Sequence, residues 1–308
     1  MKKALGKQFF LAHAIMVALI AVIVVVPNQK NILVSYYPLL VGIGVIEVLY
    51  LVSLARRVRS GRRTTGPNDI ITLVWVLMLL WELFSTKWAM TPNVLVPTPE
   101  EVFSIFYTAR ETLVNNVISS VSLLAVGYTL GMVLGIALGI VCGWIPRLRE
   151  MFYPIANVMA PIPPTVFAPY LVVLMPTFRM ASACVIILGV FWPQFLNMVL
   201  RVSSLDQELL DNARALGVRN WTMITRIILP YVTPNILQSL RVSLTTAFIM
   251  LTFAEMIGAK AGIGFYITNS SIYANYAAII AGIIVCGVVV TVLSSITQWA
   301  QRRFMTWR

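Results

Sequence analysis

The sequence predicts an all-α, polytopic membrane protein with about eight transmembrane helices, and three observations support this class. First, 59% of the 308 residues are hydrophobic and only 11% are charged, whereas an ordinary soluble domain has about 25% charged residues. Second, the mean hydropathy of +0.86 is spread over several long apolar runs, which excludes a soluble head on a single anchor. Third, the basic residues behind the net charge of +12 cluster beside these runs. They are typical of topology signals and headgroup contacts, and they do not predict nucleic-acid binding.

A transmembrane helix needs about 20 apolar residues, and eight segments satisfy this length. The first is too long for the apolar core of a signal peptide, and the Pro27-Asn28-Gln29 that follows it is no small-residue cleavage site. We therefore expect it to stay in the mature chain. The eight segments are residues 9–27, 35–55, 69–88, 115–143, 152–176, 180–200, 231–257 and 276–300.

Lys and Arg in the short loops predict the orientation, because they concentrate on the cytoplasmic side. With the N-terminus inside, seventeen of them fall on the cytoplasmic face and five on the outer face, so the sequence predicts an N-in, C-in topology. Arg241 is omitted because it lies within a span. The cytoplasmic set is Lys2, Lys3, Lys7, Arg56, Arg57, Arg59, Arg62, Arg63, Arg147, Arg149, Arg201, Arg214, Arg219, Arg226, Arg302, Arg303 and Arg308, and the outer set is Lys30, Lys87, Arg110, Arg179 and Lys260.

A short interfacial helix is expected on the outer face between the third and fourth spans. Thr98 and Glu101 have the spacing of a capping box, and Pro99 suits the first helical position. Val102 and Phe103 then begin an apolar side. A linker helix without chemistry is the simpler interpretation, since capping boxes are common.

The fourth span has a glycine at every fourth position. Each step of four residues advances about 40° around the helix, so we expect the glycines to form a packing face that a partner helix approaches closely. They do not predict a nucleotide site, because the chain contains no G-x-x-x-x-G-K-[ST] sequence. If ATP drives this protein, another subunit must bind it. The packing residues are Gly127, Gly131, Gly135, Gly139 and Gly143.

The fifth span is rich in proline, which removes backbone donors and is tolerated in a membrane where protein or a wet cavity satisfies the freed carbonyls. A broken helix beside a pathway and a plain kinked helix are both compatible with this pattern. The prolines are Pro154, Pro161, Pro163, Pro164, Pro169 and Pro176.

The remaining polar groups predict no catalytic, cofactor-binding or metal site. Cys142, Cys184 and Cys286 all fall inside apolar runs without the spacing of metal ligands. His13 is the only histidine, so a membrane-embedded enzyme lacks a nucleophile and base.

The cytoplasmic loop 204–230, between the sixth and seventh spans, is too long and too patterned for a simple connector. Ser204 and Gln207 have the spacing of a capping box, apolar residues repeat at helical spacing, and Gly217 stands where a left-handed helix terminus belongs. A second helix is expected from Asn220 to Pro230. The pattern alone is equally compatible with a membrane-surface paddle, a docking element for a soluble partner, and a structural elbow.

The same loop resembles a known family motif. The loop is similar to the EAA loop of binding-protein-dependent ABC importer permeases, although Asp211 replaces Glu and Asn212 replaces Ala. The matching pattern is Asp211-Asn212-Ala213, three residues, Gly217, nine residues, Ile227, one residue and Leu229-Pro230. With Val96-Pro97-Thr98-Pro99, Ala160-Pro161-Ile162-Pro163-Pro164 and Ala254-Glu255-Met256-Ile257-Gly258-Ala259, the chain resembles the nitrate, sulfonate, taurine and bicarbonate branch from about residue 70 onward. Residues 67–308 are therefore interpreted as the type I importer permease core and residues 1–66 as an extension with two additional spans.

The resemblance implies a mechanism with partners. Two cytoplasmic ABC ATPase subunits would bind ATP and Mg and close on the loop. A second permease chain, either an identical copy in a homodimer or a homologue, would complete the pathway. An extracytoplasmic solute-binding protein would deliver a small anion such as sulfonate, taurine, nitrate or bicarbonate. The chain itself would hold no cofactor and would lie in the bacterial plasma (inner) membrane. Pro230 would restart the seventh span. The coupling residues implied are Leu209, Asp211, Ala213, Arg214, Leu216, Gly217, Ile227, Leu229 and Pro230.

Two other functions remain open from the sequence. An ion- or proton-coupled secondary transporter would bury ionisable relays, for which the few candidates are Glu47, Glu82, Arg241 and Glu255. An importer of a heterocyclic vitamin precursor is also compatible with the family pattern. Glu255 is in addition the one residue proposed for the solute pathway.

Overall fold

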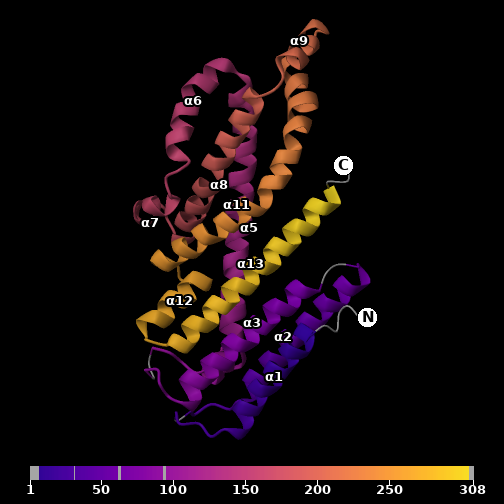
Figure 1. Ribbon diagram of the computed structural model, residues 1–308. Helices are drawn as coiled ribbons and strands as arrows, with labels where there is room; N and C mark the ends of the chain where they lie inside the picture. Colours follow the sequence, from indigo (N-terminus) through magenta and orange to yellow (C-terminus); the bar gives the residue numbers. More distant parts are fainter. Residues whose placement is uncertain (1–6, 31, 62–63, 93–94, 305–308) are drawn as a thin grey trace. The chain divides into compact units, whose positions relative to one another are not determined.

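The fold is given by a computed structural model that describes residues 7–30, 32–61, 64–92 and 95–304, in which every regular element is helical (Figure 1). The all-α class is confirmed. Five basic residues of the orientation argument, Lys2, Lys3, Arg62, Arg63 and Arg308, lie outside the described residues, and the N-in, C-in orientation stays a prediction.

Seven helices of the described chain are long and apolar enough to cross a membrane, in agreement with the predicted multi-pass protein. They are α1 (Lys7–Val25), α2 (Tyr37–Arg59), α3 (Thr65–Glu82) with the π-helical turn Leu83–Lys87, α5 (Arg110–Trp144), α8 (Phe178–Ser203), α11 (Leu229–Gly258) with a helical lead-in from Asn220, and α13 (Tyr276–Phe304). The shorter helices are α4 (Pro99–Thr108), α6 (Pro146–Met159), α7 (Ala168–Leu174), α9 (Gln207–Ala215), α10 (Asn220–Thr222) and α12 (Ile263–Ile272).

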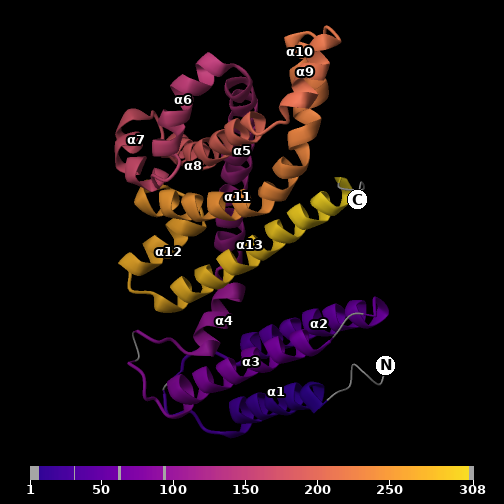
Figure 2. The same cartoon turned by 45° about the horizontal axis from the view of Figure 1, so that its top comes forward.

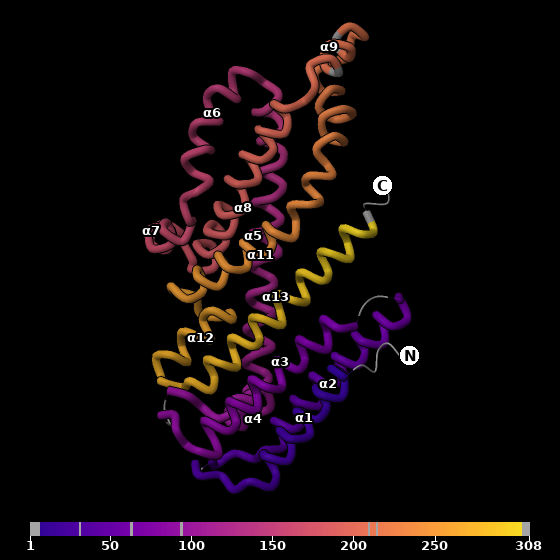
Figure 3. Tube along the Cα trace, in the orientation of Figure 1, coloured from indigo at the N-terminus to yellow at the C-terminus, as the bar shows by residue number. Residues whose placement is uncertain are grey.

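The proline-rich fifth segment is broken. Helices α6 and α7 meet at a bend of 85°, with a short 3₁₀ turn, Pro164–Phe167, before α7 (Figure 3). Pro163 is extended, with φ of −61° and ψ of 122°, as expected for a residue that precedes another proline. Of the two interpretations that the sequence left open, the broken helix is correct, and the pair amounts to an eighth span if its two parts are counted together.

The chain divides into two compact units, and the first contains residues 7–113 and 269–283 of the described chain. Its core joins α1, α2 and α3 through Leu19, Leu39 and Trp75, and Phe103 of α4 packs against this core. The first two spans thus share a core with α3 and α4. The predicted boundary after residue 66 separates sequence patterns, and it stays a prediction.

Buried charges hold one end of the helices of this unit together. The Lys87 ammonium donates to the carbonyl oxygens of Ile23 and Val26, at 3.2 and 2.8 Å, and lies 3.4 Å from a Glu82 carboxylate oxygen. The Thr86 hydroxyl is within 3.3 Å of both Glu82 and Glu100. These groups are almost completely buried, so the cation and its partners stabilise one another in place of water.

Helix α4 begins at the expected capping box. The Thr98 hydroxyl accepts from the Glu101 amide at 3.3 Å, and the Glu101 carboxylate accepts from the Thr98 amide at 2.9 Å. Pro99 occupies the first turn, and Val102 is fully buried. The local signal therefore placed the start of this helix correctly.

The second unit contains residues 114–268 and 284–304 of the described chain, and its centre is the close pairing of α5 with α8. A Cβ atom added at each of five glycines on α5 would have its nearest neighbour, an atom of α8, at 2.7 to 3.0 Å, which is closer than side chains allow. The glycines therefore let the two backbones approach. They are Gly127, Gly131, Gly135, Gly139 and Gly143.

Candidate functional site

The loop between α8 and α11 contains α9, which projects at one end of these two helices (Figures 1 and 2). The predicted capping box was wrong. Ser204 belongs to the end of α8, where its hydroxyl donates to the Arg201 carbonyl at 3.0 Å. Asp206 caps α9 instead, since its carboxylate accepts from the Glu208 amide at 3.0 Å.

One face of α9 packs against its own chain. Leu210 and Ala213 are buried in a cluster with Leu205, with Met223 and Ile228 of the following turn, and with residues of α5, α8 and α11. Ala213, which the family resemblance assigned to partner contact, thus holds α9 to the ends of the long helices. The side chains of Leu209 and Arg214 lie outside the described part of the structure.

Another face of the loop is exposed. The Leu216 side chain is 84% exposed and Trp221 is 73% exposed, although both are large and apolar. Asp211 lies at the surface of α9. Trp221 lies within the second helix expected from the sequence, but local spacing does not show which apolar positions of that helix the chain itself covers.

Gly217 ends α9 in a left-handed conformation with φ of +69°. The Val218 amide donates to the Ala213 carbonyl at 3.1 Å, which is the long hydrogen bond of a Schellman motif, and Val218 packs against the same cluster. Among the described residues, none has an atom within 4 Å of a Cβ built at Gly217. The glycine is therefore required for its backbone conformation and not for close approach.

The second helix of the loop does not stop at Pro230. A π-helical turn, Met223–Ile228, follows α10 and runs directly into α11, so that the stretch Asn220–Gly258 is one helical span of 39 residues. The expectation that this helix ends at Pro230 is wrong, because the chain stays helical through it. Pro230 itself lies in the first turn of α11, a position where proline is well tolerated. Ile227 packs against the α9 cluster, and Leu229 and Pro230 are exposed.

Glu255 lies near the opposite end of α11 and is 1% exposed. The Ser120 hydroxyl of α5 is 2.7 and 2.9 Å from its two carboxylate oxygens, and the Gly264 amide donates to one of them at 2.9 Å. The Ser120 oxygen also accepts from the Ile263 amide at 2.8 Å. The carboxylate thus lies at the N-terminus of α12, where negative charge is stabilising.

This network fixes the turn between α11 and α12. Gly262 has φ of +130°, and a Cβ there would overlap the Glu255 carboxylate. Its amide donates to the Asn116 side chain of α5 at 2.8 Å. Because the Glu255 oxygens are used inside the chain, we assign this residue to positioning the turn. Nothing in the local sequence signalled a contact with Ser120, which is 135 positions away.

The other carboxylates suggested as transporter relays also have partners within the chain. Glu47 lies 2.9 Å from the His13 ring, and Glu82 lies 3.4 Å from the Lys87 ammonium. Arg241 is exposed on α11. These contacts account for the buried carboxylates as structural groups.

Comparisons with known proteins agree with the resemblance seen in the sequence. The model of the family "Binding-protein-dependent transport system inner membrane component" matches residues 131–306, which is more than half of the chain. Among curated proteins, SsuC of Bacillus subtilis (strain 168), a permease named for transport of aliphatic sulfonates, is 27% identical over 259 residues, or 82% of this chain and 92% of SsuC. The taurine transport system permease protein TauC of Escherichia coli (strain K12) is 26% identical over 75% of this chain and 86% of TauC.

A nitrate permease and one solved structure complete this picture. The nitrate import permease protein NrtB of Leptolyngbya laminosa is 26% identical over 74% of this chain and 84% of NrtB. A chain of the inward-facing MetNI methionine ABC transporter has a TM-score of 0.55 at 18% identity and covers 64% of this chain and 95% of its own length. The MetNI structure shows a shared fold. The family match confirms the predicted resemblance to binding-protein-dependent importer permeases.

Proposed function

Because the chain belongs to the family of binding-protein-dependent transport system inner membrane components, it is a membrane permease subunit, and we propose that it forms the solute pathway of an ATP-driven importer of small anions. The names of SsuC, TauC and NrtB support this solute class, since they refer to sulfonates, taurine and nitrate. Each of these solutes carries an anionic oxygen group.

The observation that supports coupling best is the way α9 is mounted. Its buried face is joined to α8 and α11 through Leu210, Ala213 and Met223, while Leu216 and Trp221 present apolar surface outward. Leu216 directly follows α9 and Trp221 lies on α10, and an exposed aromatic side chain beside a well-anchored helix is a typical anchor for a partner protein. We therefore assign the exposed face, with Asp211, to contact with an ATPase subunit.

The complete transporter in this proposal contains two cytoplasmic ATPase subunits that bind ATP and Mg, a second copy of this permease, and an extracytoplasmic binding protein that delivers the anion. Leu209, Arg214, Ile227, Leu229 and Pro230 belong to the same coupling segment. Movement of the ATPases would displace α9, and α8 and α11 would follow as rigid bodies because α9 is packed onto both.

The experiment that tests coupling replaces Gly217 with valine. A β-branched residue in the left-handed region is strained by about 1–3 kcal/mol, so the end of α9 should shift while the spans remain folded. We expect loss of transport and of solute-stimulated ATP hydrolysis in the reconstituted complex. Gly61→Val is the matched control, because Gly61 has φ of +64° and no atom of the described residues lies within 4 Å of an added Cβ.

A charge reversal gives an independent test. Asp211→Lys changes the exposed face of α9 and should weaken ATPase association, whereas Glu150→Lys, at an exposed position of α6, should leave it unchanged. Copurification of the ATPase with each variant measures the effect. If Gly217→Val and Asp211→Lys both transport normally and retain the ATPase, the coupling assignment is wrong.

A further inference from the structure

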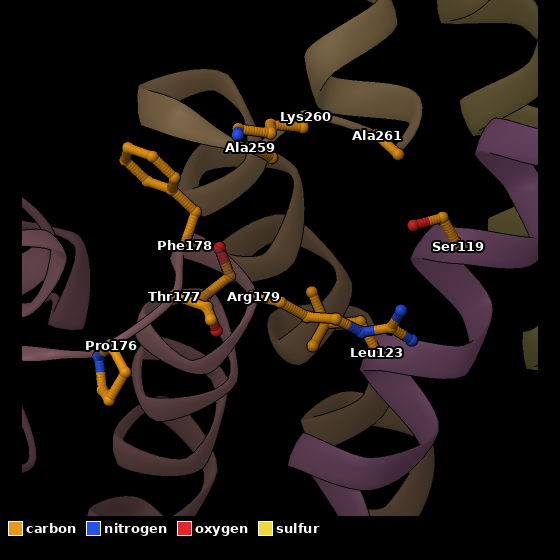
Figure 4. Close-up of a pocket in the computed structure, with 10 residues that line it drawn as sticks. Ser119, Leu123, Pro176, Thr177, Phe178, Arg179, Ala259, Lys260 and Ala261 are labelled. Carbon is orange, nitrogen blue, oxygen red and sulfur yellow. The ribbon is translucent and has the colours of Figure 1, made fainter.

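A cavity of about 480 Å³ lies at the ends of α8 and α11 that are opposite to α9, beside α5. Figure 4 shows the residues that line it. It lies entirely within the second unit and is formed by one turn of α5, the start of α8 and the turn after α11. This volume is in the range of small-molecule sites, about 300–1,000 Å³. Its lining residues are Ser119, Leu123, Pro176, Thr177, Phe178, Arg179, Ser182, Ala259, Lys260 and Ala261.

The charged groups of this lining have one sign. Arg179 and Lys260 both contribute to the cavity wall, and the lining contains no Asp or Glu. Hydroxyl groups of Ser119, Thr177 and Ser182 add neutral donors. A cavity with two cations and several hydroxyls favours an anion.

The Arg179 side chain is held in place across the cavity. Figure 4 shows it extending from the start of α8 to α5, where one guanidinium nitrogen donates to the Ser122 hydroxyl at 2.9 Å. Ser122 in turn donates to the Ser119 carbonyl at 2.8 Å. A guanidinium has five N–H groups in a planar fork, so this anchor leaves donors for a ligand.

Helix α8 begins at the same wall. Thr177 is its cap and accepts from the Met180 amide at 3.2 Å. The helix is 26 residues long, and the partial positive charge at its N-terminus adds to that of the two cations. The positive groups therefore have three independent sources in one cavity.

The rest of the lining is apolar. Leu123, Pro176 and Phe178 contribute side chains that offer an anion no hydrogen bond, and Ala259 and Ala261 are small and apolar. An inorganic anion would leave this surface uncovered, whereas an anion with a short hydrocarbon part would contact it. Cavity size and composition thus agree on an organic anion.

We propose that this cavity is a binding site in the permease itself for a small organic anion of the alkanesulfonate type, with Arg179 and Lys260 binding the charged group and Leu123 and Phe178 contacting the hydrocarbon part. The inference rests on the proposed function for the direction of transport. Helix α8 is about 39 Å long at 1.5 Å per residue, and the cavity and α9 lie at its opposite ends. If α9 meets a cytoplasmic ATPase, the cavity opens toward the side from which the binding protein delivers solute.

The test measures binding of ethanesulfonate to the full-length permease in lipid nanodiscs by ligand-observed NMR, without ATP, ATPase or binding protein. Arg179→Gln and Lys260→Gln should each weaken binding about tenfold or more, because a charge-assisted hydrogen bond is lost. Arg179→Lys should fall between wild type and Arg179→Gln, since it keeps the charge but not the fork. Arg110→Gln is the matched control, because Arg110 is predicted on the same face but does not line this cavity.

The hydrocarbon part is tested with a series from methanesulfonate to butanesulfonate. Affinity should rise several-fold with chain length, and Leu123→Ala should reduce this gain without abolishing binding of methanesulfonate. Nitrate should compete weakly. Equal competition by nitrate and butanesulfonate would contradict the organic anion.

Three other outcomes would overturn the site: no saturable binding of ethanesulfonate, unchanged binding after Arg179→Gln and Lys260→Gln, or equal loss after Arg110→Gln. Thermal unfolding of each variant shows whether it is folded. Replacing these cations should leave the fold intact, because all three side chains are exposed. Since binding is measured without ATPase, its failure is distinct from failure of coupling. If coupling to the ATPase is normal but ethanesulfonate does not bind, only the proposed site is wrong. If ethanesulfonate binds but coupling fails, only the importer mechanism is wrong.

Discussion

The close approach of α5 and α8 predicts that Gly139→Ala destabilises the protein although alanine favours helices. A Cβ at Gly139 would lie 2.8 Å from the Phe195 carbonyl oxygen, 3.2 Å from the Phe195 Cα and 2.7 Å from the Met198 Cβ. Two of these three atoms belong to the backbone of α8, and the third is fixed to it. No side-chain rotation relieves the overlap, so the helices must separate by roughly half an ångström or more.

The magnitude follows from two opposing terms. Overpacking of this kind costs about 1–3 kcal/mol, whereas replacing glycine by alanine within a helix contributes about 1 kcal/mol in favour of folding. Gly287 of α13 provides the matched control, because no atom lies within 4 Å of a Cβ built there. The gain in helix propensity from glycine to alanine is the same in both variants and cancels in the comparison. Gly139→Ala should therefore be less stable than Gly287→Ala by about 1–3 kcal/mol, the cost of overpacking.

Thermal unfolding in detergent, followed by reaction of a thiol-specific fluorophore, measures this difference. Cys142 is buried on α5, three positions after Gly139, and in a background with Cys184 and Cys286 replaced it reports locally when the helix pair opens. We expect Gly139→Ala to expose this thiol at a lower temperature than wild type, and Gly287→Ala to expose it at an equal or higher temperature. Equal shifts in both variants would refute the packing argument.

Three further predictions concern buried groups and orientation. Glu255→Gln should lower the free energy of unfolding by about 1–3 kcal/mol, because a donor at the α11–α12 turn loses its acceptor; an unchanged melting temperature would contradict this role. Lys87→Met should cost about 3–5 kcal/mol, because Glu82 stays buried without its cation, and adding Glu82→Gln should recover part of the loss. A cysteine at position 61, in a background without the native cysteines, should resist an impermeant thiol reagent in intact cells, and ready labelling there would reverse the predicted orientation.

Short sequence patterns predicted those elements whose formation depends on residues close together in the chain. The lengths of the apolar runs gave the spans, and the Thr98 capping box placed the start of α4, because its hydrogen bonds join residues three positions apart. The four-residue repeat of glycines on α5 likewise showed a face for close packing. It could not identify α8 as the neighbour, since that depends on contacts between residues far apart in the chain.

The coupling loop shows where such signals fail. Ser204 and Asp206 are both residue types that can cap α9. Which of them caps it depends on where α8 ends, and the hydrogen bond from Ser204 to Arg201 shows that Ser204 still belongs to the end of α8. Leu210 and Ala213 are the buried apolar positions among the described side chains of α9, and their burial depends on contacts with α5, α8 and α11 that local spacing does not show. The cavity was missed because its two cations are separated by 81 positions and were counted only as topology signals.

The arrangement of α8 and α11 explains how one event at the loop reaches the cavity. The stretch Asn220–Gly258 is helical over 39 residues, or about 58 Å, so Trp221 near its start and Lys260 just past its end are joined by one element. Packing of α9 onto both helices and of α8 onto the glycines of α5 leaves little freedom for local adjustment, because well-packed contacts shift between discrete arrangements and do not deform continuously. The π-helical turn Met223–Ile228 and Pro234 are the places where the helical hydrogen bonds of this stretch change, and bends in long helices occur at such sites. A displacement of α9 must therefore either bend α11 at these positions or tilt it as a whole. Only tilting moves Lys260 relative to Arg179. Tilting would thus change the spacing of the two cations that would hold the anion.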